Sequence, residues 1–257
     1  MRSKSKPLRW AAPAIALGAL AAWETGARLG IVPTLFFPAP SRVFLRLAVL
    51  AQSGELFLHF GATLSRMLVA LAWGGGSGLA LGMALGYSPR LRTVVDPFIA
   101  AFHPVPKMAL LPLIMLIFGI GFFSKVLLVA ISAFFPMVIN TMSGVLQLDP
   151  NYFDVARLHG ASRRRIFWRI VLPGSLPMTL AGARLAMNRA LGATIAMELI
   201  TAQNGLGSML FVAWQTYRSE ELYATIFVIA LFGYLFRRLT TGLAARLVPW
   251  QAGERPG

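Results

Sequence analysis

The chain offers few side chains that could carry out covalent or metal chemistry. Its 257 residues include no cysteine, and His59, His103 and His159 lie far apart without the spacing of metal ligands. The sequence has no phosphate-cradling loop of the form G-x-x-x-x-G-K followed by Ser or Thr. It also has no cluster of His, Asp, Glu and Ser within an apolar segment. We therefore expect no catalytic residue, no metal site and no cofactor bound by this chain.

Polar side chains interrupt one otherwise apolar segment, residues 176–200. They are Arg184, Asn188, Arg189 and Glu198. Charged groups inside a membrane usually face the interior of a helix bundle or water. Arg184, Asn188 and Arg189 could therefore attract an anion on a translocation path. The alternative is that Arg184 extends to the inner membrane surface and Arg189 pairs with an acidic neighbour. Glu198, near the outer end, could line the same path or pair with a basic group.

The composition is that of a membrane protein. Hydrophobic residues make up 57% of the chain and charged residues 13%, whereas soluble domains carry roughly 25% charged residues. The length allows about six spans of ~20 residues. The net charge of +15 comes from basic residues in the loops between apolar runs, as expected for cytoplasmic loops. We therefore predict an all-α polytopic membrane protein whose partner is a lipid bilayer and not nucleic acid.

The expected elements follow from the apolar runs and the prolines. Six spans are predicted, at residues 10–29, 61–87, 108–122, 126–148, 176–200 and 222–248. Ser41 is a plausible N-cap for a short helix at the membrane surface. Prolines break residues 88–112 and rule out one regular helix there. We expect His59 and Arg66 to lie at the outer interface.

Charge asymmetry sets the orientation. Basic residues concentrate in the segments that are inside when the N-terminus is inside, so we expect both ends of the chain in the cytoplasm. Residues 1–9 are then a cytoplasmic N-terminal segment, residues 10–248 the transmembrane domain, and residues 249–257 a disordered cytoplasmic tail. The polar interval at residues 149–173 is a cytoplasmic loop.

Glycines recur every four residues in the second span. This spacing places on one helix face Gly74, Gly78, Gly82 and Gly86. A face without side chains lets a neighbouring backbone approach closely, which favours helix packing in lipid. We predict a tight helix contact there.

The polar interval between the fourth and fifth spans reads DVARLHGASRRRIFWRIVLP from Asp154 to Pro173. We expect a short helix over residues 154–158 that Gly160 ends, and a second helix that Pro173 stops. Two short helices joined at a glycine would form a compact knob that another protein could grip.

This interval resembles the cytoplasmic loop of permease subunits of ATP-binding-cassette importers. The family pattern is E-A-A, three residues, G, nine residues, then I-x-L-P. The matching positions are Asp154, Val155, Ala156, Gly160, Ile170, Leu172 and Pro173, with Arg157 and Ala161 inside the motif. Asp replaces Glu and Val replaces Ala, which affects docking contacts more than the assignment.

The resemblance covers nearly the whole chain. The segments VPKMALLPLIMLIFGIG and ITAQNGLGSML look like the permeases of the sulfonate, taurine, nitrate and bicarbonate group. It implies a type I importer transmembrane domain in a bacterial inner membrane, paired with a second permease copy as a homodimer. It also implies two ATPase subunits, which bind ATP and Mg, and an external substrate-binding protein. The cytoplasmic knob would be the coupling helix that inserts into the ATPase.

Two questions stay open from the sequence. An ATP-independent secondary transporter or channel is the main alternative function, although the sequence has none of the inverted repeats found in many transporters. The substrate would be a small organic or inorganic anion, or alternatively a vitamin or pyrimidine precursor.

Overall fold

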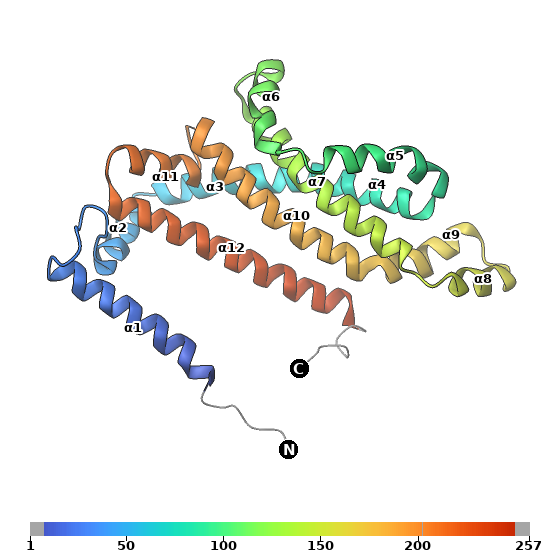
Figure 1. The fold of residues 1–257 in the computed structure, drawn as a ribbon, viewed down its shortest axis with the longest axis horizontal. Coiled ribbons are helices and arrows are strands. Elements are labelled where there is room, and N and C mark those ends of the chain that lie inside the picture. Colours follow the sequence, from blue (N-terminus) through green and yellow to red (C-terminus); the bar gives the residue numbers. More distant parts are fainter. Residues whose placement is uncertain (1–7, 202, 250–257) are drawn as a thin grey trace.

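The computed structural model describes residues 8–201 and 203–249, and every regular element within those ranges is a helix (Figure 1). The predicted all-α class is therefore confirmed. Most of the predicted N-terminal segment (1–9) and tail (249–257) lies outside the described residues.

Four helical segments in the described ranges are long and apolar enough to cross a membrane. The first runs through α3 (Glu55–Ala70), the π-helical turn η1 (Leu71–Gly75) and α4 (Gly76–Tyr87). The second is α7 (Phe122–Leu146). The third runs through α9 (Arg163–Ile166), the π-helical turn η3 (Phe167–Val171) and α10 (Leu172–Thr201), and the fourth is α12 (Ser219–Leu247).

The described residues thus hold four continuous spans, or five with one bent pair, where the sequence predicted about six. The bent pair is α5 (Pro89–Phe102) and the segment formed by η2 (Lys107–Leu110) and α6 (Leu111–Phe118), which meet at 89° and form either a broken span or a re-entrant loop. α1 (Leu8–Arg28) has 21 residues, about 30 Å of helix. Glu24 and Arg28 near its end make it less apolar than the four continuous spans, and it is not among them.

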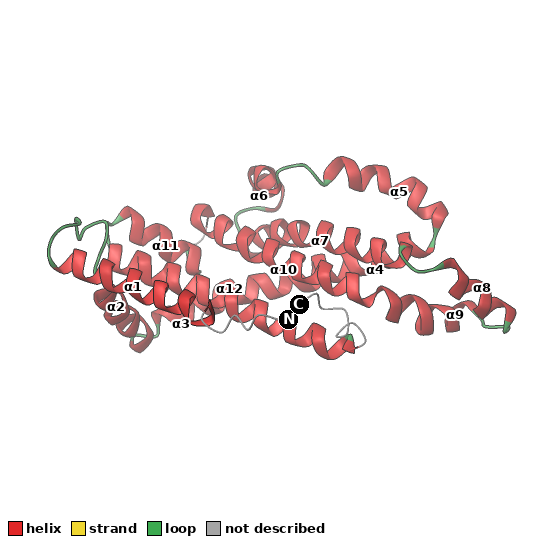
Figure 2. Cartoon of the chain, turned by 60° about the horizontal axis from the view of Figure 1, so that its bottom comes forward, coloured by secondary structure: helices red, strands yellow, loops and turns green. Residues whose placement is uncertain are grey.

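The short helices lie at the two ends of the bundle (Figure 1). α8 (Pro150–Leu158) and α9 are at one end, and α2 (Pro40–Gln52) and α11 (Leu206–Gln215) are at the other. The first residues of α1 and the last residues of α12 point toward the end that holds α8. α5 and α6 lie on one side of α7 (Figure 2).

α7 is the central helix, and the segment formed by α3, η1 and α4 packs against it through its glycines. These glycines are Gly74, Gly78, Gly82 and Gly86. A Cβ built at Gly74 would overlap the Ala130 backbone, and one at Gly78 would lie 2.8 Å from the carbonyl oxygen of Phe134. All four glycines therefore face α7 with no room for a side chain.

Two predicted elements are wrong in detail. Ala39 and not Ser41 is the N-cap of α2, because Pro40 occupies the first helical position. Ser41 instead donates its backbone N–H and its hydroxyl to the carboxylate of Glu24, at 2.9 and 2.7 Å. The predicted third span, residues 108–122, is not one helix: α6 has only 8 residues and ends at Gly119, whose φ is +77°.

Candidate functional site

The polar interval folds into two short helices with well-defined ends. Asp149 caps α8 by accepting a hydrogen bond from the N–H of Asn151 at 2.9 Å. At the other end Gly160 has φ +68°, its N–H donates to Arg157, and the N–H of Ala161 donates to Ala156, both at 2.9 Å. This pair of bonds is a Schellman motif. α8 thus begins one turn before the predicted start at residue 154, and Gly160 ends the helix as predicted.

The knob, residues 149–173, has an inner face that anchors it to the bundle. Ile166 and Val171 are buried with Met83 of α4 and Val145 of α7. Packed against this cluster are Phe153, Ala156, Ala161, Ile170 and Leu172. Four of the predicted coupling residues, Ala156, Ala161, Ile170 and Leu172, therefore pack against the buried core of this chain. The inner face of the knob therefore shares one buried cluster with α4 and α7.

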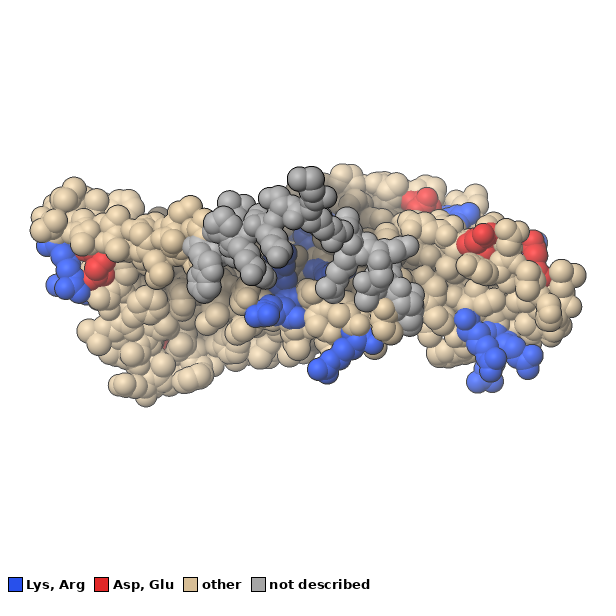
Figure 3. Space-filling view, turned by 90° about the horizontal axis from the view of Figure 1, so that it is seen from below, with Lys and Arg blue, Asp and Glu red and all other residues tan. Residues whose placement is uncertain are grey.

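The knob also has an outer face that this chain does not cover. Tyr152, Val155 and Leu158 are spaced by three residues along α8, and Leu158 is 85% exposed. Asp154 and Arg157 lie beside them as an exposed ion pair of 3.3 Å. Figure 3 shows Lys and Arg at this end of the molecule. The exposed basic residues of the interval are Arg157, Arg163, Arg164, Arg165 and Arg169. An apolar stripe edged by charge is a surface suited to a protein partner.

Pro173 does not stop the second helix, contrary to the prediction. The helix runs from Arg163 to Thr201 as one 39-residue segment. Proline has no N–H to donate to the carbonyl four residues back, and its ring clashes with that carbonyl. The π-helical turn η3 immediately precedes this position. A wider turn accommodates such a break in the hydrogen-bond ladder, so the helix continues through the proline.

Asn188 and Arg189 line a pocket of about 600 Å³ in the middle of the bundle. From α7 come Ser132, Phe135 and Pro136, and from α10 also Gly192, Ala193 and Ala196. The third wall is the elbow between α5 and α6, residues 103–108. Arg184 lies outside this pocket, on the same exposed side of α10.

The side chain of Lys107 stabilises the elbow through hydrogen bonds to its backbone. Its Nζ donates to the carbonyl oxygens of Phe102, His103 and Val105 at 2.6, 3.0 and 2.8 Å. It also lies 4.3 Å from the centre of the Phe135 ring. An ammonium group has three N–H donors, so all of them are used. Two of these carbonyls, of Phe102 and His103, lie where α5 ends, which is where a cation is favoured.

Glu198 does not face this pocket, so the structure does not support its predicted place on the path. Its side chain is buried at the outer end and pairs with Arg66 of α3 at 2.6 Å. It also accepts hydrogen bonds from Thr63 at 2.8 Å and from the N–H of Gly207 at 3.0 Å. Arg66 further donates to the backbone carbonyl and the side chain of Asn204.

Arg66 is therefore not a free interfacial side chain but is buried in the protein at the outer end of the bundle. Arg66 is 6% exposed, and His59 forms a hydrogen bond with the N–H of Gly205 at 3.0 Å. A Cβ at Gly205 would overlap the carboxyl group of Glu198. This outer network joins α3, α10 and the start of α11.

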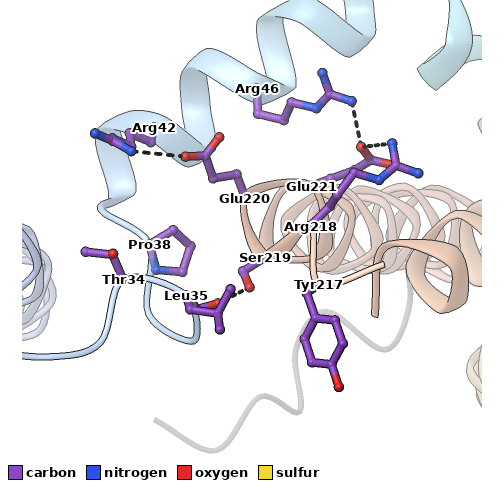
Figure 4. Close-up of a pocket in the computed structure, with 10 residues that line it drawn as sticks. All are labelled: Thr34, Leu35, Pro38, Arg42, Arg46, Tyr217, Arg218, Ser219, Glu220 and Glu221. Carbon is purple, nitrogen blue, oxygen red and sulfur yellow. Dashed lines mark hydrogen bonds and ion pairs between the residues drawn. The ribbon is translucent and has the colours of Figure 1, made fainter. Parts of the chain in front are cut away.

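The outer end also carries an open charged hollow of about 470 Å³ (Figure 4). Glu221 is buried and accepts from Arg46 at 2.7 Å and from Arg218 at 3.0 Å. Arg42 and Glu220 form a longer, exposed pair of 3.7 Å. These contacts tie α2 to the start of α12.

Comparison with known proteins identifies the family. Residues 76–252 match the model of the binding-protein-dependent transport system inner membrane component. The chain belongs to this family. It is therefore an ATP-binding-cassette importer permease, a multi-pass protein of the inner membrane.

Two curated relatives are identical to this permease at about a third of the aligned positions. It is 34% identical to the taurine transport system permease protein TauC of Escherichia coli (strain K12), over 96% of this chain and 94% of the relative. It is 33% identical to the putative aliphatic sulfonates transport permease protein SsuC of Bacillus subtilis (strain 168), over 90% and 84%. Permeases of this kind work with ATPase and substrate-binding partners.

The permease fold also matches a solved structure. The inward-facing MetNI methionine ABC transporter superposes with a TM-score of 0.65 and 19% identity, over 72% of this chain and 93% of that chain. This likeness confirms the predicted type I importer fold.

Sequence reasoning missed several residues of this permease. Leu158 and Tyr152 stand out only as apolar residues on a polar helix, a signal that was available in the sequence. The prolines of residues 88–112 indicated the elbow, but the partner of Glu198 had no such signal. Arg66 lies 132 residues from Glu198 along the chain, so only the fold brings them together.

Proposed function

We propose that this permease forms half of a translocation pathway for a small oxyanion, such as a sulfonate, taurine, nitrate or bicarbonate. A second copy of the chain supplies the other half. The observation that carries the proposal is the pocket beside Arg189, which combines a guanidinium with apolar side chains and has no Asp or Glu among its described lining residues. The names of the two curated relatives, which refer to taurine and aliphatic sulfonates, support the same class of substrate.

Residues 149–173 are proposed to be the coupling element. The exposed apolar stripe of α8 would enter a groove on an ATPase subunit, where ATP and Mg are bound. The anchored inner face would then carry movement of the ATPase into α4 and α7, because the buried cluster of Met83, Val145, Ile166 and Val171 joins all three parts. The hydrolysis itself takes place on the partner, and this chain supplies no catalytic residue.

The proposed cycle is alternating access. A loaded binding protein docks on the outer face, and ATP closes the two ATPase subunits, which draws the two knobs together. The helices then open outward and receive the anion. Hydrolysis returns the pair to the inward-facing state.

The experiment that tests this function is uptake by proteoliposomes. The permease would be reconstituted with its ATPase and its binding protein, and internal ATP supplied. Accumulation of radiolabelled taurine, an alkanesulfonate, nitrate or bicarbonate that requires ATP and the binding protein is the expected result. Uptake only of solutes that carry no oxyanion group would contradict the proposed substrate class.

A further inference from the structure

One basic side chain near the middle of α10, Arg189, has no partner in the described part of the chain and is available to bind a ligand. Arg189 stands 17 residues after Leu172 and 12 before Thr201 in α10, about 26 Å and 18 Å from the two helix ends. It is exposed, and it forms no hydrogen bond or ion pair within the part of the chain that the structure describes. A guanidinium at that depth is costly unless it meets water or an anion.

The other cations near the pocket are placed differently. Lys107 spends all three N–H donors on carbonyl oxygens of the elbow. The ring of His103 lies against Phe135, with their centroids 5.8 Å apart. Arg184 is on the same side of α10 but does not line the pocket. Among the described residues that line the pocket, the permanently charged groups are Lys107 and Arg189, and only Arg189 has unused donors.

The chemistry of the walls indicates what would fit. A guanidinium presents a planar fork that matches two oxygens of a sulfonate, carboxylate or nitrate. Asn188 adds an amide beside it, and Phe135 and Ala196 offer an apolar surface for a short carbon chain. One guanidinium and no carboxylate suit a monovalent oxyanion and give a free cation no partner.

We propose that this pocket is the anion subsite of the permease and that Arg189 is the residue that binds the oxyanion. The inference rests on the proposed function, since it locates the substrate group that this function implies. It also assigns the two neighbouring arginines of α10 different roles: Arg189 binds the anion, and Arg184 does not.

The test uses the absence of cysteine in the natural chain. Gly192→Cys places one thiol in the pocket, three residues from Arg189, at a position where a Cβ meets no atom within 4 Å. The thiol in the assembled complex is labelled with an anionic reagent, 2-sulfonatoethyl methanethiosulfonate, or with its cationic trimethylammonium counterpart. The ratio of the two rates on the permease chain measures the local preference for an anion.

We expect Arg189→Gln to lower this ratio by roughly 10-fold, because the charge lies close to the thiol. Arg189→Lys should keep it, since the charge remains. Arg184→Gln is the matched control and should change the ratio less than about 2-fold, because its charge is two helical turns away and screened by salt. An unchanged ratio in Arg189→Gln, or an equal fall in Arg184→Gln, would overturn the subsite. Ser132→Cys, on the α7 wall, is the reporter if Gly192→Cys does not fold.

Uptake then separates this inference from the function on which it rests. In proteoliposomes, both Arg189→Gln and Arg189→Lys should raise the KM for taurine or 1-butanesulfonate by about 10-fold or more, because lysine lacks the planar fork. A wild-type complex that imports no oxyanion would overturn the proposed substrate class. Normal wild-type uptake with a KM that Arg189→Gln leaves unchanged would overturn the subsite alone.

Discussion

Removing the charge of Glu198 should destabilise the permease far more than the loss of one hydrogen bond. The carboxylate accepts from Arg66 through one oxygen and from Thr63 and Gly207 through the other. In Glu198→Gln, the single amide oxygen can accept either from Arg66 or from Thr63 and Gly207. The NH₂ group then faces the remaining donors and cannot accept from them. The guanidinium of Arg66, 6% exposed, is left without its counter-charge.

The expected magnitude distinguishes an ion pair from an ordinary contact. Hydrogen bonds between membrane helices contribute about 0.6 to 1.7 kcal/mol. Removing one partner of a buried ion pair costs about 3 to 5 kcal/mol. For a chain of this size, that corresponds to a fall in melting temperature of roughly 6 to 20 °C. Heating the purified permease in lipid nanodiscs and measuring the fraction that stays monodisperse would give the shift.

Two controls make the result decisive. Glu220→Gln removes an exposed pair with Arg42, whose atoms are 3.7 Å apart, and should cost less than about 1 kcal/mol. The double variant Arg66→Met with Glu198→Met should lose much less stability than the two single variants together, because no charge is stranded. A shift in Glu198→Gln no larger than that in Glu220→Gln would refute the reasoning.

Three further predictions concern packing and coupling. Gly78→Leu should prevent α4 from packing against α7 and abolish assembly of the complex, as measured by size-exclusion chromatography. Gly76→Leu is the control and should assemble normally, because a Cβ at that position meets nothing within 4 Å. Leu158→Asp should leave the melting temperature of the permease unchanged but weaken ATPase binding by roughly 10- to 100-fold, since a buried leucine contributes about 1.5 to 3 kcal/mol; tight binding would count against the stripe. Asp149→Ala should destabilise α8 by about 1 kcal/mol and speed its hydrogen exchange, while exchange in α10 stays the same.

The sequence was most informative where the signal was local. The four-residue glycine spacing needs only the helical period to define one face, and the structure places that face against α7. The motif at 149–173 also depends on short-range features: a capping Asp, a glycine with positive φ and an apolar stripe. Hydropathy alone placed the spans of α7 and α12 to within four residues at each end. The segment Glu55–Tyr87 begins six residues before its predicted start, and the segment Arg163–Thr201 begins thirteen residues before.

Three features of the structure were not predicted from the sequence, for different reasons. Nothing next to Arg66 in the chain indicates that it is buried, because its partner Glu198 is on another helix. The elbow at 103–108 is shaped by Lys107, whose charge suggests a loop and not a cap on a helix end. Pro173 predicts a helix end, and the π-helical turn before it removes that requirement. Only the burial of Arg66 depends on a distant segment, whereas Lys107 and the turn before Pro173 act through neighbouring residues.

The central claim is that ATP drives transport through the knob at 149–173. The most direct measurement is ATP hydrolysis and taurine uptake recorded together in proteoliposomes that contain the permease, its ATPase and its binding protein. Gly160 has φ +68°, which proline cannot adopt. We expect Gly160→Pro, or deletion of Asp154–His159, to leave the chain inserted in the membrane but to abolish uptake and the stimulation of hydrolysis by the loaded binding protein. Full uptake and stimulation in either variant, or transport by the purified chain alone without ATP, would contradict the account.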